Sequence, residues 1–109
     1  MYDWSAMKKF TILIPVYNDW DSLKKLLNNI NNNIKNFTVA QFNCVIVNDS
    51  STTKHSEIKI PSKISSIKII NMKKNKGHAR CNAFGIKYLS LNSDLDYVIL
   101  MDGDGEDRP

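Results

Sequence analysis

The chain has 109 residues, of which 42% are hydrophobic and 24% are charged, and its formal net charge is +4. These values suit one folded domain with a modest core, and they exclude a two-domain enzyme, a disordered chain and a collagen-like or coiled-coil rod. No apolar run approaches the ~20 residues of a membrane-spanning helix and no signal-peptide pattern opens the chain, so we expect a cytoplasmic protein without a transmembrane segment.

Charge is distributed unevenly along the chain. Residues 54–93 hold nine Lys and Arg against Glu57, whereas residues 94–109 hold six acids against Arg108. A basic middle predicts an anionic partner, and an acidic end predicts either a bound cation or a solvated tail. The two cysteines, Cys44 and Cys81, fit neither a disulfide framework nor a zinc pattern, so we expect free thiols.

The predicted elements alternate between strands and helices. A continuous apolar run over residues 10–17 predicts a buried strand, and the next segment places Leu and Ile at helical spacing, with Asp19, Asp21 or Ser22 available as the N-cap. Residues 42–48 predict a second strand, and Pro61 predicts a loop rather than a long helix over residues 54–66.

Residues 67–71 and 96–101 predict two further strands. Between them we expect a helix over residues 78–91 that turns Ala79, Ala83 and Ile86 toward a sheet. Four strands joined by helices or long crossovers predict a Rossmann-like α/β fold, with a mostly parallel sheet of about four strands and helices on both faces. Ligands of such sheets bind beyond the carboxyl ends of the strands, where residues 17–19, 48–50 and 102–107 are expected.

The pair Asp102 and Asp104, separated by Gly103, follows the fourth predicted strand. Two carboxylates at this spacing can turn toward one point on a loop, and hard divalent cations prefer such oxygen ligands. A metal held there could bridge the protein to a diphosphate and neutralise it as a leaving group. The alternative is an acidic loop with turn-forming glycines, and the position directly after a buried strand favours the metal site.

Two side chains at the ends of the first two predicted strands could contact a nucleobase. Asp49 could accept a hydrogen bond from a base N–H, or it could cap the following turn through the backbone of Ser51. Tyr17 could stack on the base, or it could pack in the core with its hydroxyl reaching solvent.

The start of the second predicted helix suits an anion. Residues 73–76 contribute three lysines beside the helix N-terminus, and Arg80 in the first turn fits a bidentate phosphate contact. His78 has a weaker claim, since a histidine there is more often a helix-start or packing residue than a ligand.

These segments together resemble the N-terminal, nucleotide-binding half of the inverting family 2 glycosyltransferases of GT-A fold. The resemblance lies in four motifs, at residues 12–19, 45–51, 75–85 and 97–109. On this basis residues 1–9 are an N-terminal tail, and residues 10–109 are the donor-binding half of a glycosyltransferase domain. Asn48 stands where many relatives have the first Asp of an Asp-Asp pair, and Asp19 stands where many have Glu.

The resemblance implies a nucleotide-diphosphate sugar as donor, Mg²⁺ or Mn²⁺ as cofactor, and a polyprenyl phosphate or a cell-surface glycan as acceptor. It implies a nucleotide site made by Pro15, Tyr17, Asp19, Asp49, Arg80 and Asp102, and a metal site made by Asp102 and Asp104. The catalytic base is expected beyond Pro109, so we expect a truncated form that binds donor without turnover. The complete enzyme could be peripheral at the inner face of the membrane.

Two other functions compete with this interpretation. A non-catalytic α/β module could use the acidic cluster to bind Mg²⁺ or a nucleotide for regulation, although a receiver domain would place a lone Asp after its third strand. A nucleic-acid binder could use the basic middle, but residues 54–87 lack aromatic side chains interleaved with the lysines, with Phe84 as the single aromatic residue. We therefore expect no nucleic-acid partner.

Overall fold

The computed structural model describes residues 8–36, 40–53, 58–92 and 96–102. The described residues form β1 (Lys8–Val16), α1 (Trp20–Ile34), β2 (Ala40–Asn48), β3 (Ser66–Asn71), α2 (His78–Asn92) and β4 (Tyr97–Leu100). Neither of the two described helices is long and apolar enough to cross a membrane. The predicted order of elements is confirmed, and each strand boundary lies within two residues of its expected place.

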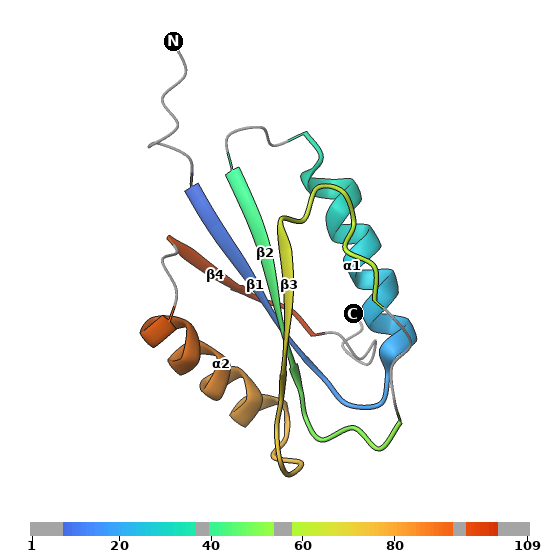
Figure 1. The fold of residues 1–109 in the computed structure, drawn as a ribbon, viewed down its shortest axis with the longest axis vertical. Helices are drawn as coiled ribbons and strands as arrows, with labels where there is room; N and C mark the ends of the chain where they lie inside the picture. The colour runs from blue at the N-terminus through green and yellow to red at the C-terminus, as the bar shows by residue number, and fades with distance from the viewer. Residues whose placement is uncertain (1–7, 37–39, 54–57, 93–95, 103–109) are drawn as a thin grey trace.

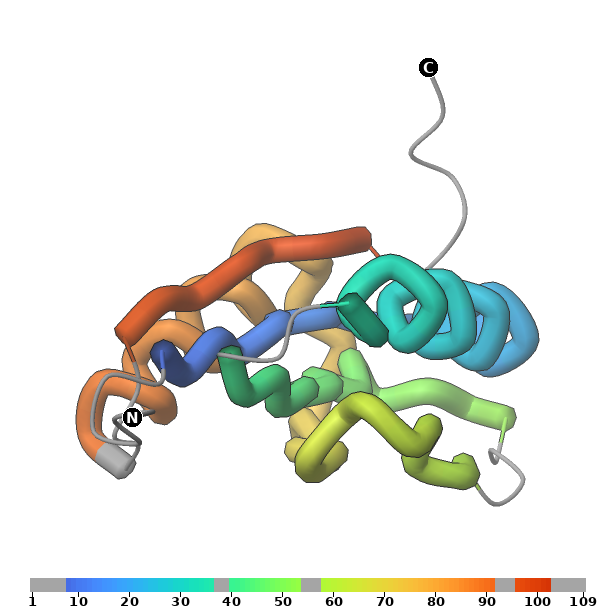
Figure 2. The backbone as a smooth tube through the Cα atoms, turned by 90° about the horizontal axis from the view of Figure 1, so that it is seen from above, coloured from blue at the N-terminus to red at the C-terminus, as the bar shows by residue number. Residues whose placement is uncertain are grey.

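The four strands form one parallel sheet in the order β3-β2-β1-β4 (Figure 1). Val16 of β1 lies opposite Asn48 of β2, and Leu13 of β1 lies opposite Leu100 of β4. Figure 2 shows β2 and β4 on either side of β1, which is where the order of the strands reverses. Ligands of open α/β sheets bind at such a reversal, so the sheet itself points to the carboxyl end of β1.

The two helices cover opposite faces of this sheet (Figure 1). Side chains alternate between the faces of a strand, and on β1 Ile12 and Ile14 pack in the α1 cluster while Leu13 packs in the α2 cluster. α1 buries one apolar stripe, made by Trp20, Leu23, Leu27, Ile30 and Ile34. The predicted Rossmann-like α/β fold is therefore confirmed, with helices on both faces.

The expected contact face of α2 was wrong. Ala79, Ala83 and Ile86 are exposed, and the helix instead turns Cys81, Gly85 and Leu89 to the sheet. α2 carries apolar residues on both of its sides, so their spacing did not identify the buried one. Close approach is still the reason for a small residue, because a Cβ on Gly85 would lie 2.5 Å from Leu13 Cδ1.

The amino end of the sheet is closed by aromatic side chains. Phe10 of β1 stacks on Phe42 of β2, with ring centroids 5.2 Å apart, and on Tyr97 of β4, with centroids 5.0 Å apart. These three residues are cross-strand partners in the register of the sheet, so the stack supports that register.

Candidate functional site

Two loops at the carboxyl end of the sheet are fastened to each other by Asn18. Its side-chain Oδ1 accepts hydrogen bonds from the backbone N–H groups of Thr52 (2.8 Å) and Thr53 (2.9 Å), and its own backbone N–H donates to Ser51 Oγ (2.9 Å). Asn18 has φ 60° and Ser50 has φ 59°, a left-handed backbone that Asn adopts more readily than most residues. The segments after β1 and β2 therefore form one connected unit.

The start of α1 belongs to the same unit. Asp19 is the N-cap, and its Oδ1 accepts from the backbone N–H of Ser22 (3.3 Å), as expected for one of the three candidate caps. The Trp20 indole Nε1 donates to the carbonyl of Thr53 (3.1 Å). Asp19 thus caps α1, and it lies at the edge of the sheet where the nucleotide site is predicted.

The Asp49 carboxylate is buried against the start of α2. Its Oδ1 accepts from the backbone N–H of Lys76 (2.7 Å) and its Oδ2 from that of Gly77 (2.9 Å), and the residue is 1% exposed. The Gly77 carbonyl in turn accepts from the backbone N–H of Cys81 (3.1 Å), so these amides lie at the helix N-terminus. The anion at this N-terminus is therefore the protein's own carboxylate.

The thiol of Cys81 belongs to the same cluster. Burial, and then a hydrogen bond to Asp49 and the negative charge of that carboxylate, raise the pKa of Cys81 to about 12. Burial also raises the pKa of Cys44 to about 12, and both thiols are free, as expected. Neither cysteine is suited to act as a nucleophile, because the thiolate is the reactive form.

The turn after β2 is held by Asn48. Its Oδ1 accepts from the backbone N–H of Ser51 (3.0 Å), and its Nδ2 donates to Asn71 Oδ1 at the end of β3 (2.9 Å). The alternative prediction, that Asp49 caps the Ser51 turn, is therefore wrong: Asn48 caps that turn, while Asp49 binds the loop before α2. The printed sequence alone could not separate these two partners, because the loop before α2 is 26 or more positions away.

The end of β4 reaches the first turn of α2 from the other side. His78 Nδ1 lies 3.6 Å from Asp102 Oδ1, and both side chains are partly open to solvent. β4 is held in place by the backbone N–H of Met101, which donates to the carbonyl of Leu13 (3.0 Å). The start of α2 thus contacts two strand ends, since Lys76 and Gly77 just before it bind Asp49 after β2 and His78 in its first turn lies beside Asp102 after β4.

The remaining predicted site residues differ in accessibility. Tyr17 follows the end of β1 and is 39% exposed, so its stacking on a base and its packing with an exposed hydroxyl both stay predictions. Arg80 is exposed in the first turn of α2. Pro15 is fully buried within β1, and it can shape the site only through the backbone that follows it. Asp104 lies outside the described residues.

The described residues supply only part of the predicted metal site. Within residues 8–36, 40–53, 58–92 and 96–102, no three His, Cys, Asp or Glu side chains converge on a possible cation. Asp102 presents a partly exposed carboxylate just after β4, and an oxygen ligand of this kind fits Mg²⁺ or Mn²⁺. The fit then depends on Asp104 and on oxygens of a bound ligand.

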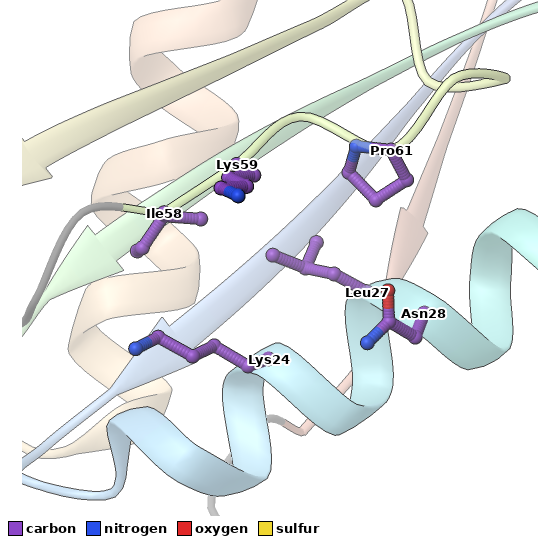
Figure 3. A pocket seen from close by; sticks show the side chains of 6 residues that line it. All are labelled: Lys24, Leu27, Asn28, Ile58, Lys59 and Pro61. Carbon is purple, nitrogen blue, oxygen red and sulfur yellow. The ribbon is translucent and has the colours of Figure 1, made fainter.

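A separate groove of about 270 Å³ lies between α1 and the segment before β3 (Figure 3). Lys24, Leu27 and Asn28 line it from α1, and Ile58, Lys59 and Pro61 line it from the facing segment. The predicted site residues are absent from its lining among the residues that the structure describes. The groove is therefore distinct from the carboxyl end of the sheet.

Comparison with known proteins gives concordant matches. The model of the family described as "Glycosyl transferase family 2" matches residues 11–109. The undecaprenyl-phosphate 4-deoxy-4-formamido-L-arabinose transferase of Salmonella choleraesuis (strain SC-B67) is 24% identical over 110 residues, which cover 100% of this chain and 33% of that protein.

Two crystal structures of S. aureus TarS share the fold. The structure of residues 1–349 superposes with a TM-score of 0.69 at 25% identity, over 88% of this chain and 27% of that chain. A second structure of TarS gives a TM-score of 0.68 at 25% identity, over 88% of this chain and 16% of that one. The chain thus spans a third or less of the length of these similar proteins.

Proposed function

Because the chain belongs to glycosyl transferase family 2, we propose that it is the donor-binding part of an inverting glycosyltransferase that uses a nucleotide-diphosphate sugar. The observation that carries the proposal is the start of α2, where Gly77 donates to Asp49 after β2 and His78 lies beside Asp102 after β4. A diphosphate needs neutralising and hydrogen-bonding groups at one place, and the first turn of α2 presents the exposed Arg80 two positions after His78. We propose transfer to an acceptor only for a whole protein of the length of these relatives, since this chain spans 33% of the Salmonella relative.

The nucleotide site that we propose uses the residues expected from the sequence in two ways. Tyr17, Arg80 and Asp102 are accessible and would touch the base, the phosphates and the ribose or diphosphate respectively. Pro15, Asp19 and Asp49 would act by shaping the site, since their side chains are buried or already engaged with the backbone. Asn48 and Asn18 join this second group through their loop contacts.

Asp102 and Asp104 would hold Mg²⁺ or Mn²⁺ together with oxygens of the diphosphate. A bound metal would stabilise the negative charge that develops on the departing nucleoside diphosphate. His78, 3.6 Å from Asp102, would orient that carboxylate from the protein side. Arg80 would add a charge-assisted contact to the phosphates from the first turn of α2.

The acceptor that we propose is a polyprenyl phosphate. The name of the Salmonella relative includes undecaprenyl phosphate, and that relative matches along the whole of this chain. A cell-surface glycan is the alternative acceptor, and with either one the complete protein would act at the inner face of the membrane.

A calorimetric titration tests the donor site directly. The chain is titrated with UDP- and GDP-sugars in the presence and absence of Mn²⁺. We expect binding that requires Mn²⁺ and that falls at least about tenfold in Asp104→Asn, because a neutral amide binds a hard cation weakly. Tyr17→Ala should weaken binding without changing its dependence on the metal.

Asp21→Asn is the matched control, since Asp21 is an exposed acid on α1. It should bind as the unmodified chain does. Binding of every nucleotide sugar that ignores Mn²⁺ and Asp104→Asn would overturn the metal-dependent donor site. Binding of Mg²⁺ alone, without any nucleotide, would favour the regulatory module instead.

A further inference from the structure

The unit formed by β3 and α2 is unusually basic. Residues 58–92 contain eight Lys and Arg and no Asp or Glu. Three of these lysines, Lys73, Lys74 and Lys76, are clustered within four positions between β3 and α2. Such a concentration of one sign attracts anionic partners over distances of about a Debye length.

A groove of about 460 Å³ opens between these lysines and α2. Its lining consists of Asn71, Met72, Lys73, Lys74, Lys76 and Phe84. Met72 packs against the core beneath α2, while the Phe84 ring is 42% exposed. The groove therefore combines an apolar floor and wall with a cationic rim.

The outer side of α2 continues this combination. Lys87 and Leu91 follow Phe84 by three and seven positions, so they share its side of the helix. This side lies away from Cys81, Gly85 and Leu89, which face the sheet, and Leu91 is 73% exposed. A helix with apolar residues on its solvent side as well as its core side is typical of one that meets another phase or partner.

We infer that these residues form a docking surface for an anionic lipid bilayer. The basic apolar surface is defined as Met72, Lys73, Lys74, Lys76, Phe84, Lys87 and Leu91. The lysines would lie at the phosphate headgroups, and the exposed Phe84 and Leu91 side chains would enter the boundary with the acyl chains. Charge complementarity selects an anionic membrane, and the exposed apolar side chains distinguish a bilayer from a soluble anion.

The position of this surface is compatible with the donor site. β3 lies at one edge of the sheet and β4 at the other, with β2 and β1 between them. The first turn of α2 reaches Asp102 through His78, whereas Phe84 and Leu91 lie in its later turns. The inference rests on the proposed location at the inner face of the membrane and adds the surface that would meet the bilayer; it requires neither donor nor metal.

Flotation with lipid vesicles tests the inference on the whole chain. Vesicles of phosphatidylcholine with about 30% phosphatidylglycerol are compared with vesicles of pure phosphatidylcholine, each at low and at high salt. We expect binding to the anionic vesicles only, and a fall of more than about tenfold at high salt because screening weakens the lysine contacts.

Paired substitutions separate this surface from general charge. Each lysine near an anionic bilayer contributes about fivefold to partitioning, so Lys73→Ala with Lys74→Ala should lower binding about 25-fold. Lys25→Ala with Lys35→Ala removes the same charge from exposed positions on and after α1, and should lower binding less than about threefold. Equal losses in the two pairs would overturn the assignment to this surface.

A spectroscopic variant tests insertion of the apolar residues. The tryptophan emission of Phe84→Trp should shift to the blue when anionic vesicles are added. The emission of Ile60→Trp, at a 52% exposed position outside the surface, should not shift. Thermal unfolding of each variant without vesicles shows whether it is folded. Absence of vesicle binding by the folded chain, or binding abolished equally by inorganic phosphate or by RNA, would overturn the inference, and none of these results bears on the Mn²⁺ titration of the donor site.

Discussion

The substitution Asp49→Asn separates a residue that positions the site from one that touches the nucleobase. Each carboxylate oxygen accepts one backbone N–H, from Lys76 at 2.7 Å and from Gly77 at 2.9 Å. An asparagine of the same shape replaces one acceptor by an NH₂ group, and in either orientation that group faces a backbone donor. One hydrogen bond is lost, and the other loses its charge.

The expected cost follows from these two bonds. A hydrogen bond to a charged group contributes about 1.5–3 kcal/mol to stability, and a hydrogen bond between neutral groups contributes about 1 kcal/mol. A buried N–H that is left without an acceptor costs about 1–3 kcal/mol more. Because the site is 1% exposed, water cannot replace the lost partner. We expect Asp49→Asn to lower the free energy of unfolding by about 3 kcal/mol, a large part of the stability of a small domain.

Equilibrium unfolding in urea at neutral pH measures this change as a lower midpoint with an unchanged slope. Asp96→Asn is the matched control, since Asp96 Oδ2 also accepts a backbone N–H, that of Lys9 at 2.8 Å, but at an exposed place. That variant should lose less than about 1 kcal/mol. If Asp49→Asn is as stable as Asp96→Asn and yet binds no nucleotide, Asp49 touches the ligand and the positioning role is refuted.

Three further substitutions or conditions test the packing around the site. Gly85→Ala should lower the melting temperature, because overpacking against the buried Leu13 at 2.5 Å costs about 1–3 kcal/mol, of which the gain in helix propensity offsets at most about 1 kcal/mol. Leu13→Val in the same chain should restore part of the loss, and full additivity of the two substitutions would contradict the contact. Asn18→Gly keeps the left-handed backbone and removes the side-chain bonds, so urea unfolding should show a loss of about 1–3 kcal/mol, and an unchanged midpoint would show that the two loops hold without it. Folding raises the pKa of Cys44 and Cys81 from 9.0 to about 12, so above pH 9 the thiols of the unfolded chain lose their protons before those of the folded chain do. The free energy of unfolding should therefore fall by about 1.4 kcal/mol per pH unit for each thiol between pH 9 and pH 12. A Cys44→Ala chain that keeps the full slope would argue against this effect.

The sequence predicted the fold because each element carried its own signal. Continuous apolar runs marked strands buried on both faces, and the stripe from Leu23 to Ile34 marked α1. The contact face of α2 was not predictable in the same way, because Phe84, Ile86 and Leu91 are as apolar as the residues that face the sheet. Gly85 was the available signal, since glycine is costly inside a helix unless close packing requires it.

The site was predictable as a place but not as a set of contacts. Strand ends locate the carboxyl edge, and Tyr17, Asp49 and Asp102 all lie there. The partner of Asp49 was missed because a buried carboxylate can be satisfied by any backbone amide that the fold brings near it, and the amides of Lys76 and Gly77 have no signature of their own. Asn18 carried a signal that could have been used, since Asn directly after a strand favours a left-handed turn.

The first turn of α2 links two strands that are not neighbours. β1 lies between β2 and β4, yet Gly77 is bonded to Asp49 on one side and His78 lies beside Asp102 on the other. A shift of this turn would therefore disturb both strand ends at once, through the backbone of Gly77 on one side and the side chain of His78 on the other. The separation of the groups that a molecule bound across the two ends would meet thus depends on one short stretch of backbone, residues 77–78, and on the rotamer of His78.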